Sequence, residues 1–130
     1  MCKKLPVRIR RSIYMIPLDE IIYLENELRK IRMHTTDEQG EYCFYGTFRE
    51  ISEELDHRFI GGSRTYILNA QHIRALVDEG GQYEVVMSNG HQLDFCKNSF
   101  LRIRRAYEMW IREEQEDGQK HRVRQTGATP

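Results

Sequence analysis

The sequence predicts one mostly β domain in which antiparallel sheets pack together and short helices cover them. Apolar and polar residues alternate along most of the chain, as in half-buried strands, whereas helical spacing of apolar residues is confined to two segments. Turn-forming clusters rich in Gly, Asn and Asp separate the strand-like segments. Strands and helices do not alternate regularly, which argues against a parallel, doubly wound sheet.

Strand periodicity dominates the first half of the chain. A break at residues 26–28 separates two alternating segments, which are expected to pair as a hairpin. In the first of these segments, Ile22 and Leu24 would share one face of the strand, and Ile21 and Tyr23 the other. The segments with this periodicity are residues 7–16, 18–27, 29–35 and 41–46.

A short amphipathic helix is expected next, over about residues 48–57. Thr47 and Glu50 have the spacing of a capping box, in which each side chain accepts a hydrogen bond from the backbone N–H of the other residue. Apolar residues recur at helical spacing from Phe48 to Leu55, and the opposite face is acidic.

Strand periodicity then returns and continues almost to the second helix. Asn89-Gly90 favours the positive φ angles of a two-residue type I′ turn, so residues 82–96 are expected to form a hairpin. The strand-like segments of this half are residues 64–69, 71–77, 82–88 and 91–96.

The chain is expected to close with a helix and a tail. Asn98 can cap a helix that runs to about residue 111, with apolar residues at helical spacing up to Trp110. Periodicity is lost in residues 112–130, which are expected to be a disordered tail. The folded domain would therefore cover residues 1–111.

The composition fits a single soluble globular domain. The chain has 130 residues, of which 39% are hydrophobic. Its 20 Lys and Arg residues balance 20 Asp and Glu residues, so the net charge is zero. Residues 1–11 and 97–105 nevertheless carry basic residues and no acid. A neutral total can therefore include one positive face.

Neither export nor membrane insertion is expected. Pro17 and Asp19 interrupt the apolar segment that follows the basic start of the chain, so a signal peptide is not indicated. No apolar run is long enough to span a bilayer. The three cysteines form no Cys-x-x-Cys pair, and reduced thiols in the cytoplasm are the expected state.

No group of residues in the sequence indicates catalysis. The five histidines show no i, i+4 pair and no neighbouring cysteine at metal-ligand spacing, so no metal site and no cofactor are expected. The phosphate-binding and nucleophile motifs of common enzyme families are missing. The adjacent Asp19 and Glu20 would point to opposite faces of a strand. An enzyme is therefore not expected.

Four successive segments resemble the LytTR DNA-binding domain family. The stretch IPLDEIIYLENELRKIRMHT resembles the family's opening strands, and YGTFREISEEL resembles its short helix. FIGGSRTYILNAQHIRAL resembles the family's most recognisable block, and YEVVMSNGHQLDFCKNSFLRI its closing hairpin and helix start. The resemblance covers roughly residues 13–105, in one order and with matching spacing.

The resemblance implies a bacterial transcription regulator that binds double-stranded DNA. Such domains place loops in successive major grooves, often as pairs on direct repeats and with bending of the DNA, so a homodimer on direct repeats is expected. A phosphoacceptor receiver domain usually precedes the family domain. The 130 residues leave no room for one, and a stand-alone member is therefore expected.

Three loops would contact the DNA if the resemblance is carried over residue by residue. Arg64 and Asn98 are expected to touch base edges, because Arg can bridge guanine O6 and N7 and Asn can pair with adenine N6 and N7. Ser63, in the same loop as Arg64, stands where the family usually has His, and Gly61 and Gly62 replace bulkier basic or polar residues. The residues expected mainly to hold phosphates are Arg29, Lys30, Lys97 and Arg102.

An alternative function is that of a protein-interaction module built on the final helix. Tyr107, Met109, Trp110 and Ile111 follow one another closely, which is more apolar surface than one buried stripe requires. Because Trp is favoured at interfaces, the helix would bind a second copy of the chain or a regulatory protein partner. Trp110 can equally pack onto the sheet, and the sequence leaves both interpretations open.

Overall fold

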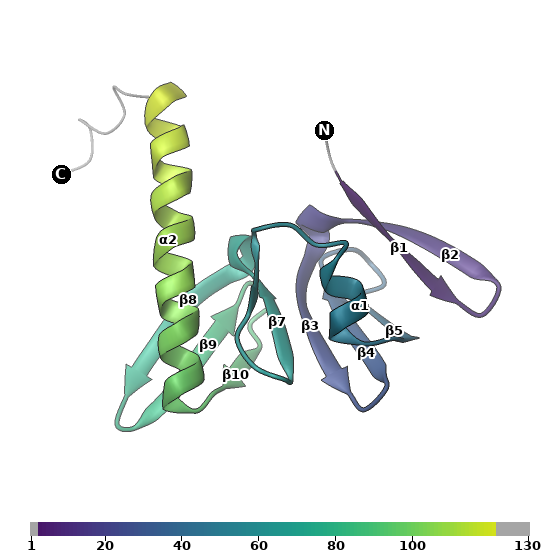
Figure 1. Ribbon diagram of the computed structural model, residues 1–130, viewed down its shortest axis with the longest axis horizontal. Helices are drawn as coiled ribbons and strands as arrows, with labels where there is room; N and C mark the ends of the chain where they lie inside the picture. Colours follow the sequence, from purple (N-terminus) through teal and green to yellow (C-terminus); the bar gives the residue numbers. More distant parts are fainter. Residues whose placement is uncertain (1–2, 122–130) are drawn as a thin grey trace.

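Three antiparallel sheets lie side by side in the molecule, with two α-helices packed against them (Figure 1). The computed structural model describes residues 3–121, with side chains for residues 3–115. A five-stranded sheet occupies the middle, between a two-stranded and a three-stranded sheet. This architecture confirms the predicted mostly β fold of packed antiparallel sheets.

The central sheet has the strand order β5-β4-β3-β7-β6, and all its neighbouring strands are antiparallel. Its strands are β3 Ile21–Glu27, β4 Lys30–Thr35, β5 Glu41–Tyr45, β6 Phe59–Gly61 and β7 Tyr66–Asn69. The three-stranded sheet consists of β8 Ile73–Glu79, β9 Gln82–Met87 and β10 Gln92–Asp94. Two 3₁₀ turns, Leu18–Glu20 and Ala70–His72, precede β3 and β8.

The chain begins with a hairpin that the sequence did not predict as two strands. The single run expected over residues 7–16 is divided between β1 Lys4–Ile9 and β2 Ser12–Pro17, which pair along their whole length. Arg10 takes a φ of 56° in the tight turn between them, where a Gly or Asn would have signalled the reversal.

A β-bulge in β3 decides which of its residues face each side of the central sheet. The register with β4 shifts between Ile21 and Tyr23, so that strict alternation is broken there. Ile21 and Leu24 consequently pack in one core, and Ile22 and Tyr23 in the other. The prediction that Ile22 and Leu24 share a face is therefore wrong.

Two hydrophobic cores cover the two faces of the central sheet. The first lies between this sheet, the β1–β2 hairpin and the first helix, and the second lies between this sheet, the three-stranded sheet and the last helix. Burial on both sides makes the central sheet the common wall of the two cores. Members of the first core include Leu5, Val7, Ile16, Leu24, Ile31 and Ile51, and members of the second include Leu68, Val85, Met87, Phe100 and Ile103.

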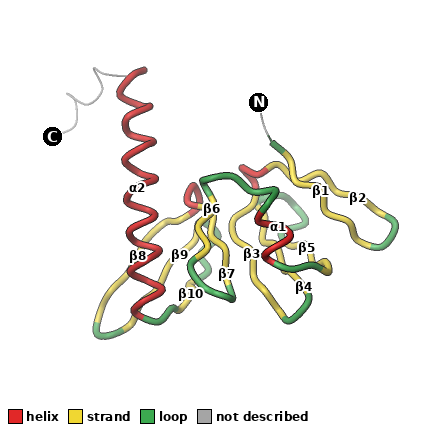
Figure 2. The backbone as a smooth tube through the Cα atoms, in the orientation of Figure 1, coloured by secondary structure: helices red, strands yellow, loops and turns green. Residues whose placement is uncertain are grey.

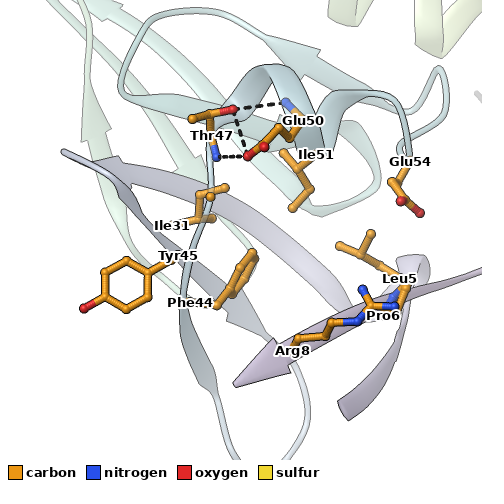
Figure 3. Close-up of a pocket in the computed structure, with 11 residues that line it drawn as sticks. Leu5, Pro6, Arg8, Ile31, Phe44, Tyr45, Thr47, Glu50, Ile51 and Glu54 are labelled. Atoms are coloured by element: carbon orange, nitrogen blue, oxygen red, sulfur yellow. Dashed lines mark hydrogen bonds between the residues drawn. The ribbon is translucent and has the colours of Figure 1, made fainter. Parts of the chain in front are cut away.

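The first helix, α1 Phe48–Ser52, has the predicted capping box. Thr47 Oγ1 accepts a hydrogen bond from the Glu50 N–H at 3.2 Å, and Glu50 Oε1 accepts one from the Thr47 N–H at 3.0 Å (Figure 3). The helix is shorter than the predicted 48–57, because the chain then tightens into i→i−3 hydrogen bonds such as Leu55 N–H to Ser52 O.

The second helix, α2 Lys97–His121, begins one residue before Asn98. The Phe100 N–H donates to the Cys96 carbonyl at 2.9 Å, which makes Cys96 the residue that precedes the first turn. The prediction that Asn98 caps this helix is therefore wrong, and Asn98 lies within the first turn.

The second helix also extends past its expected end near residue 111, and that prediction is wrong as well. Residues 112–121 continue the helix away from the sheets (Figure 1). Half of them are Glu or Gln, which are good helix formers that need no apolar neighbour. The rest of the predicted tail, residues 122–130, lies outside the described residues.

The hairpin predicted over residues 82–96 is present, but its turn is not the predicted type I′. Strand β9 pairs with β10 from Val86 opposite Gln92 to Glu84 opposite Asp94. Gly90 has a φ of 90°, whereas Asn89 is not among the described residues with positive φ. A longer loop closes the strands, and the Met87 N–H donates to the His91 carbonyl at 2.9 Å.

The loop between β6 and β7 approaches α2 so closely that its second glycine has no room for a side chain. A Cβ added at Gly62 would overlap Cγ1 and Cδ1 of Ile103, which is fully buried. A Cβ added at the neighbouring Gly61 would meet no atom within 4 Å. The close approach therefore explains a glycine at position 62 but not at position 61.

Replacing Gly62 with Ala is expected to lower the free energy of unfolding by about 1–3 kcal/mol, the usual cost of overpacking a core. Gly61→Ala is the matched control and should change it by less than about 0.5 kcal/mol. Urea unfolding followed by circular dichroism measures both. Equal effects of the two substitutions would show that the loop does not pack on Ile103 as described.

A buried histidine lies where the central sheet meets the β9–β10 turn. The His34 side chain is 8% exposed, and its Nε2 atom lies 3.4 Å from Glu25 Oε1. Its ring stacks on Tyr23 with centroids 4.2 Å apart, and the His91 ring centroid is 5.3 Å away. Burial and the neighbouring His91 lower the pKa of His34, while Glu25 and Glu41 act in the opposite direction.

Acid is therefore expected to destabilise the domain through His34. Because the pKa of His34 is lowered in the folded state, the unfolded chain takes up the proton first. The contribution of His34 to stability is complete above the ordinary value of 6.5 and is lost as the pH falls below it. Urea unfolding at about pH 7.5 and about pH 5.5, one value above and one below the ordinary histidine pKa of roughly 6.5, measures the loss in the free energy of unfolding.

His34→Phe keeps an aromatic ring beside Tyr23 and should reduce this loss of stability. His57→Asn, at an exposed position, should leave it unchanged. An undiminished loss in His34→Phe would contradict the assignment.

Candidate nucleic-acid interface

Three loops that are distant in the sequence meet at one end of the molecule. They are the β3–β4 turn, the β6–β7 loop and the start of α2 (Figures 1 and 2). The Asn26 N–H donates to the Thr65 carbonyl at 2.8 Å, and Asn26 Nδ2 donates to the Arg64 carbonyl at 3.3 Å. Arg102 Nη2 donates to the Gly62 carbonyl at 3.2 Å. We call the surface formed by residues 26–30, 62–65 and 96–102 the loop edge.

The β3–β4 turn presents basic side chains on a backbone that is held in place. The Arg29 carbonyl accepts a hydrogen bond from the Gly46 N–H at 2.9 Å, which ties the turn to the end of β5. The Arg29 and Lys30 side chains are exposed, and Lys30 Nζ lies 5.6 Å from the centre of the Tyr45 ring. Both cations can therefore meet a ligand at this end of the sheet.

In the β6–β7 loop, the predicted site residue Ser63 orders the backbone, and the next predicted residue, Arg64, projects from it. Ser63 Oγ accepts hydrogen bonds from the backbone N–H groups of Thr65 and Tyr66, each at 3.1 Å. Such a turn orders the loop from within. The Arg64 side chain is exposed and has no ion pair among the described residues.

At the start of α2, the first two side chains are exposed and the next two are buried. Lys97 and Asn98 face solvent, whereas Ser99 and Phe100 anchor the helix. A hydrogen bond between the Cys96 thiol and the Ser99 hydroxyl, together with the backbone N–H groups of Ser99 and Asn98, lowers the pKa of Cys96. The N–H groups of this first turn thus favour negative charge at Cys96, as expected at a helix N-terminus.

Arg102 makes a structural contact that sequence reasoning missed. Its guanidinium donates to the Gly62 carbonyl at 3.2 Å and to Ser99 Oγ at 3.3 Å. It therefore positions the β6–β7 loop against α2. The spacing of residues along the chain holds no signal for this contact, because 40 residues separate the two partners.

Of the two carboxylates at this end of β3, Glu27, itself part of the loop edge, is paired with a cation of β4, whereas Glu25 lies beside His34, whose lowered pKa leaves it uncharged at neutral pH. Glu27 Oε1 lies 2.9 Å from Arg32 Nη2, and Glu25 Oε1 lies 3.4 Å from His34 Nε2. Neither acid is paired with Arg29 or Arg64 among the described ion pairs. The basic side chains of the loop edge are therefore not neutralised by their own sheet.

The aromatic residues of α2 mostly belong to the second core. Tyr107 and Trp110 are partly buried against it, and their rings stack with centroids 6.1 Å apart. Met109 and Leu101 remain exposed on another side of the helix. Most of the apolar surface noted in the sequence is thus used inside the domain.

The described residues contain no group of three or more His, Cys, Asp and Glu side chains arranged to hold a metal ion. Within residues 3–121, no helix has the length and apolar character needed to cross a bilayer.

Comparisons with known proteins agree with the observed architecture. The LytTr DNA-binding domain family matches residues 11–108. The solved LytTr DNA-binding domain of a putative methyl-accepting/DNA response regulator from Bacillus cereus is 20% identical, with a TM-score of 0.66. That match covers 80% of this chain and 95% of the other, and it shows a shared fold. No curated protein matches the chain significantly. Because the family match spans most of its residues, the chain belongs to the LytTR DNA-binding domain family.

Proposed function

We propose that the chain binds duplex DNA sequence-specifically through the loop edge, inserts its loops into the major groove, and acts as a bacterial transcription regulator. Family membership supports DNA binding and a regulatory role. The observation that carries the choice of surface is the joining of three loops by hydrogen bonds of Asn26 and Arg102. These bonds hold Arg29, Arg64 and Lys97 at one end of the molecule.

The exposed side chains of the loop edge fit two kinds of DNA contact. Arg64 and Asn98 have the donor and acceptor geometry to read guanine and adenine edges. Phosphates would be held mainly by Arg29, Lys30 and Lys97, and the N–H groups at the start of α2 would add a further phosphate site. The Ser63 hydroxyl, which accepts hydrogen bonds within its own loop, could also donate one to a phosphate oxygen. Arg102 would act chiefly by holding the β6–β7 loop.

Further features of the proposed function follow from the family resemblance. Two copies would bind neighbouring direct repeats and bend the DNA between them, in the cytoplasm, where Cys43 and Cys96 remain free thiols. The zero net charge of the chain favours weak nonspecific binding. Specific contacts at the loop edge would therefore supply most of the discrimination.

A protein-interaction function for α2 is the second candidate. Met109 is 54% exposed and lines a shallow hollow with Leu101 and Ala106, so this face could pair with a second copy or a regulatory protein. Sedimentation of the wild type and of Met109→Ala distinguishes the two functions. A stable oligomer that needs Met109, together with no duplex binding at low salt, would favour this candidate.

Arg64→Ala is expected to weaken binding to the selected site by about 1–3 kcal/mol and to relax specificity at one base pair, because a bidentate base contact is lost. Selection of bound sequences from a random duplex pool, followed by gel shifts, measures both effects. Arg112→Ala, about 22 Å farther along the same helix than Lys97, is the control and should bind like the wild type. Unchanged affinity and specificity in Arg64→Ala would remove Arg64 from the interface.

Lys97→Ala is expected to weaken binding to all sequences alike, because a phosphate contact carries no base information. The slope of log K against log salt concentration should fall by about one unit. Titrations of specific and random duplexes over a range of salt concentrations measure this slope. A change confined to one base pair would instead assign Lys97 to base readout.

A further inference from the structure

We propose that Leu28, at the apex of the β3–β4 turn, contacts the methyl group of a thymine in the major groove and so adds to base specificity. The inference rests on the proposed function and extends it to an apolar residue, which arguments from charge alone do not identify. Leu28 lies on the loop edge next to Arg29, within the turn held by Asn26.

The first observation is the exposure of apolar groups at this turn. Leu28 is 95% exposed, the highest value among the large hydrophobic residues that are exposed in the described structure. Tyr45 is 79% exposed, and Figure 3 shows its ring pointing away from Phe44 and Ile31. Leu28 and Tyr45 line one surface hollow together with Arg29, Lys30 and Glu27, and the Glu27 carboxylate is paired with Arg32. The turn thus presents apolar and cationic groups side by side.

The second observation is the backbone conformation of the turn. Leu28 has a φ of 59°, in the left-handed region that Gly and Asn adopt far more readily than a branched side chain. A residue that buries nothing and strains its own backbone does not contribute to folding. Such a combination is typical of positions whose side chain serves a ligand.

The charges around the turn decide what the ligand is. Arg29 and Lys30 follow Leu28 directly, and the hydrogen bonds of Asn26 place Arg64 in the adjoining loop. A partner that covers this surface must therefore be a polyanion with an apolar group within reach. Duplex DNA meets both conditions, since the thymine methyl is the apolar group on the base edges of the major groove.

The test uses uracil, which lacks only the methyl group of thymine and pairs in the same way. A duplex site is first selected with the wild type from a random pool, and each thymine in it is then replaced by deoxyuridine in turn. We expect one such replacement to weaken wild-type binding about fourfold, the equivalent of one buried methyl group.

Two variants of Leu28 complete the test. Leu28→Ala should bind the thymine site about fourfold more weakly than the wild type does, with no further loss on the uracil site. Leu28→Asn should lose the same preference while unfolding at a higher temperature, because Asn tolerates the left-handed backbone. Ile13→Ala removes another exposed apolar side chain, 58% exposed on β2, and should retain the wild-type preference.

The outcomes separate this inference from the proposed function. Duplex binding that no uracil replacement weakens, or a thymine preference that survives in Leu28→Ala, would overturn the role of Leu28 and leave the regulator function standing. A wild-type chain that binds no duplex at any salt concentration would overturn both. Retention of the preference in Ile13→Ala, with its loss in both Leu28 variants, would establish the contact.

Discussion

The structure depends on one strand, β3, being buried on both faces and paired on both edges. It pairs with β4 on one side and β7 on the other, and the bulge after Ile21 divides its apolar side chains between the two cores. Beyond the paired segment, Asn26 continues the contact with the β6–β7 loop through backbone and side chain. The position of the loop edge is therefore a direct extension of the central sheet.

A chain without net charge can still offer a local positive surface to a polyanion. Within the described structure, acids of the central sheet meet cations of the same sheet, as Glu27 meets Arg32, whereas Arg29 and Arg64 project beyond the strands. These short-range ion pairs neutralise the acids locally, and screening by salt limits the electrostatic influence of more distant acids on the loop edge. Such a distribution would suit the proposed function, in which contacts at the loop edge rather than the total charge hold the DNA.

The loop edge combines rigid and strained elements. Gly62 fits against Ile103 because it has no side chain, and Arg102 bonds the same glycine's carbonyl, so the loop has little freedom relative to α2. Leu28 has an unfavourable backbone conformation at the apex of the β3–β4 turn. The same turn is held by the hydrogen bond from the Gly46 N–H to the Arg29 carbonyl. Rigid support of exposed side chains reduces the entropy lost on binding.

The sequence by itself determined those elements that depend on interactions between residues close together in the chain. The capping box of Thr47 and Glu50, the strand alternation around Val85 and the helical spacing of Phe100 and Ile103 depend on residues a few positions apart, and each is present in the structure. Strand periodicity and the lack of regular strand–helix alternation predicted the mostly β architecture, and the family resemblance in four successive segments agreed with it.

Tertiary structure alone decided the bulge in β3, the glycine requirement at position 62 and the bond from Arg102 to the β6–β7 loop. These features arise from contacts between residues distant in the chain, and no periodicity or spacing within a short window encodes such contacts. The residue types able to bind DNA could therefore be read from the sequence, whereas their gathering at one end of the molecule required the packed sheets.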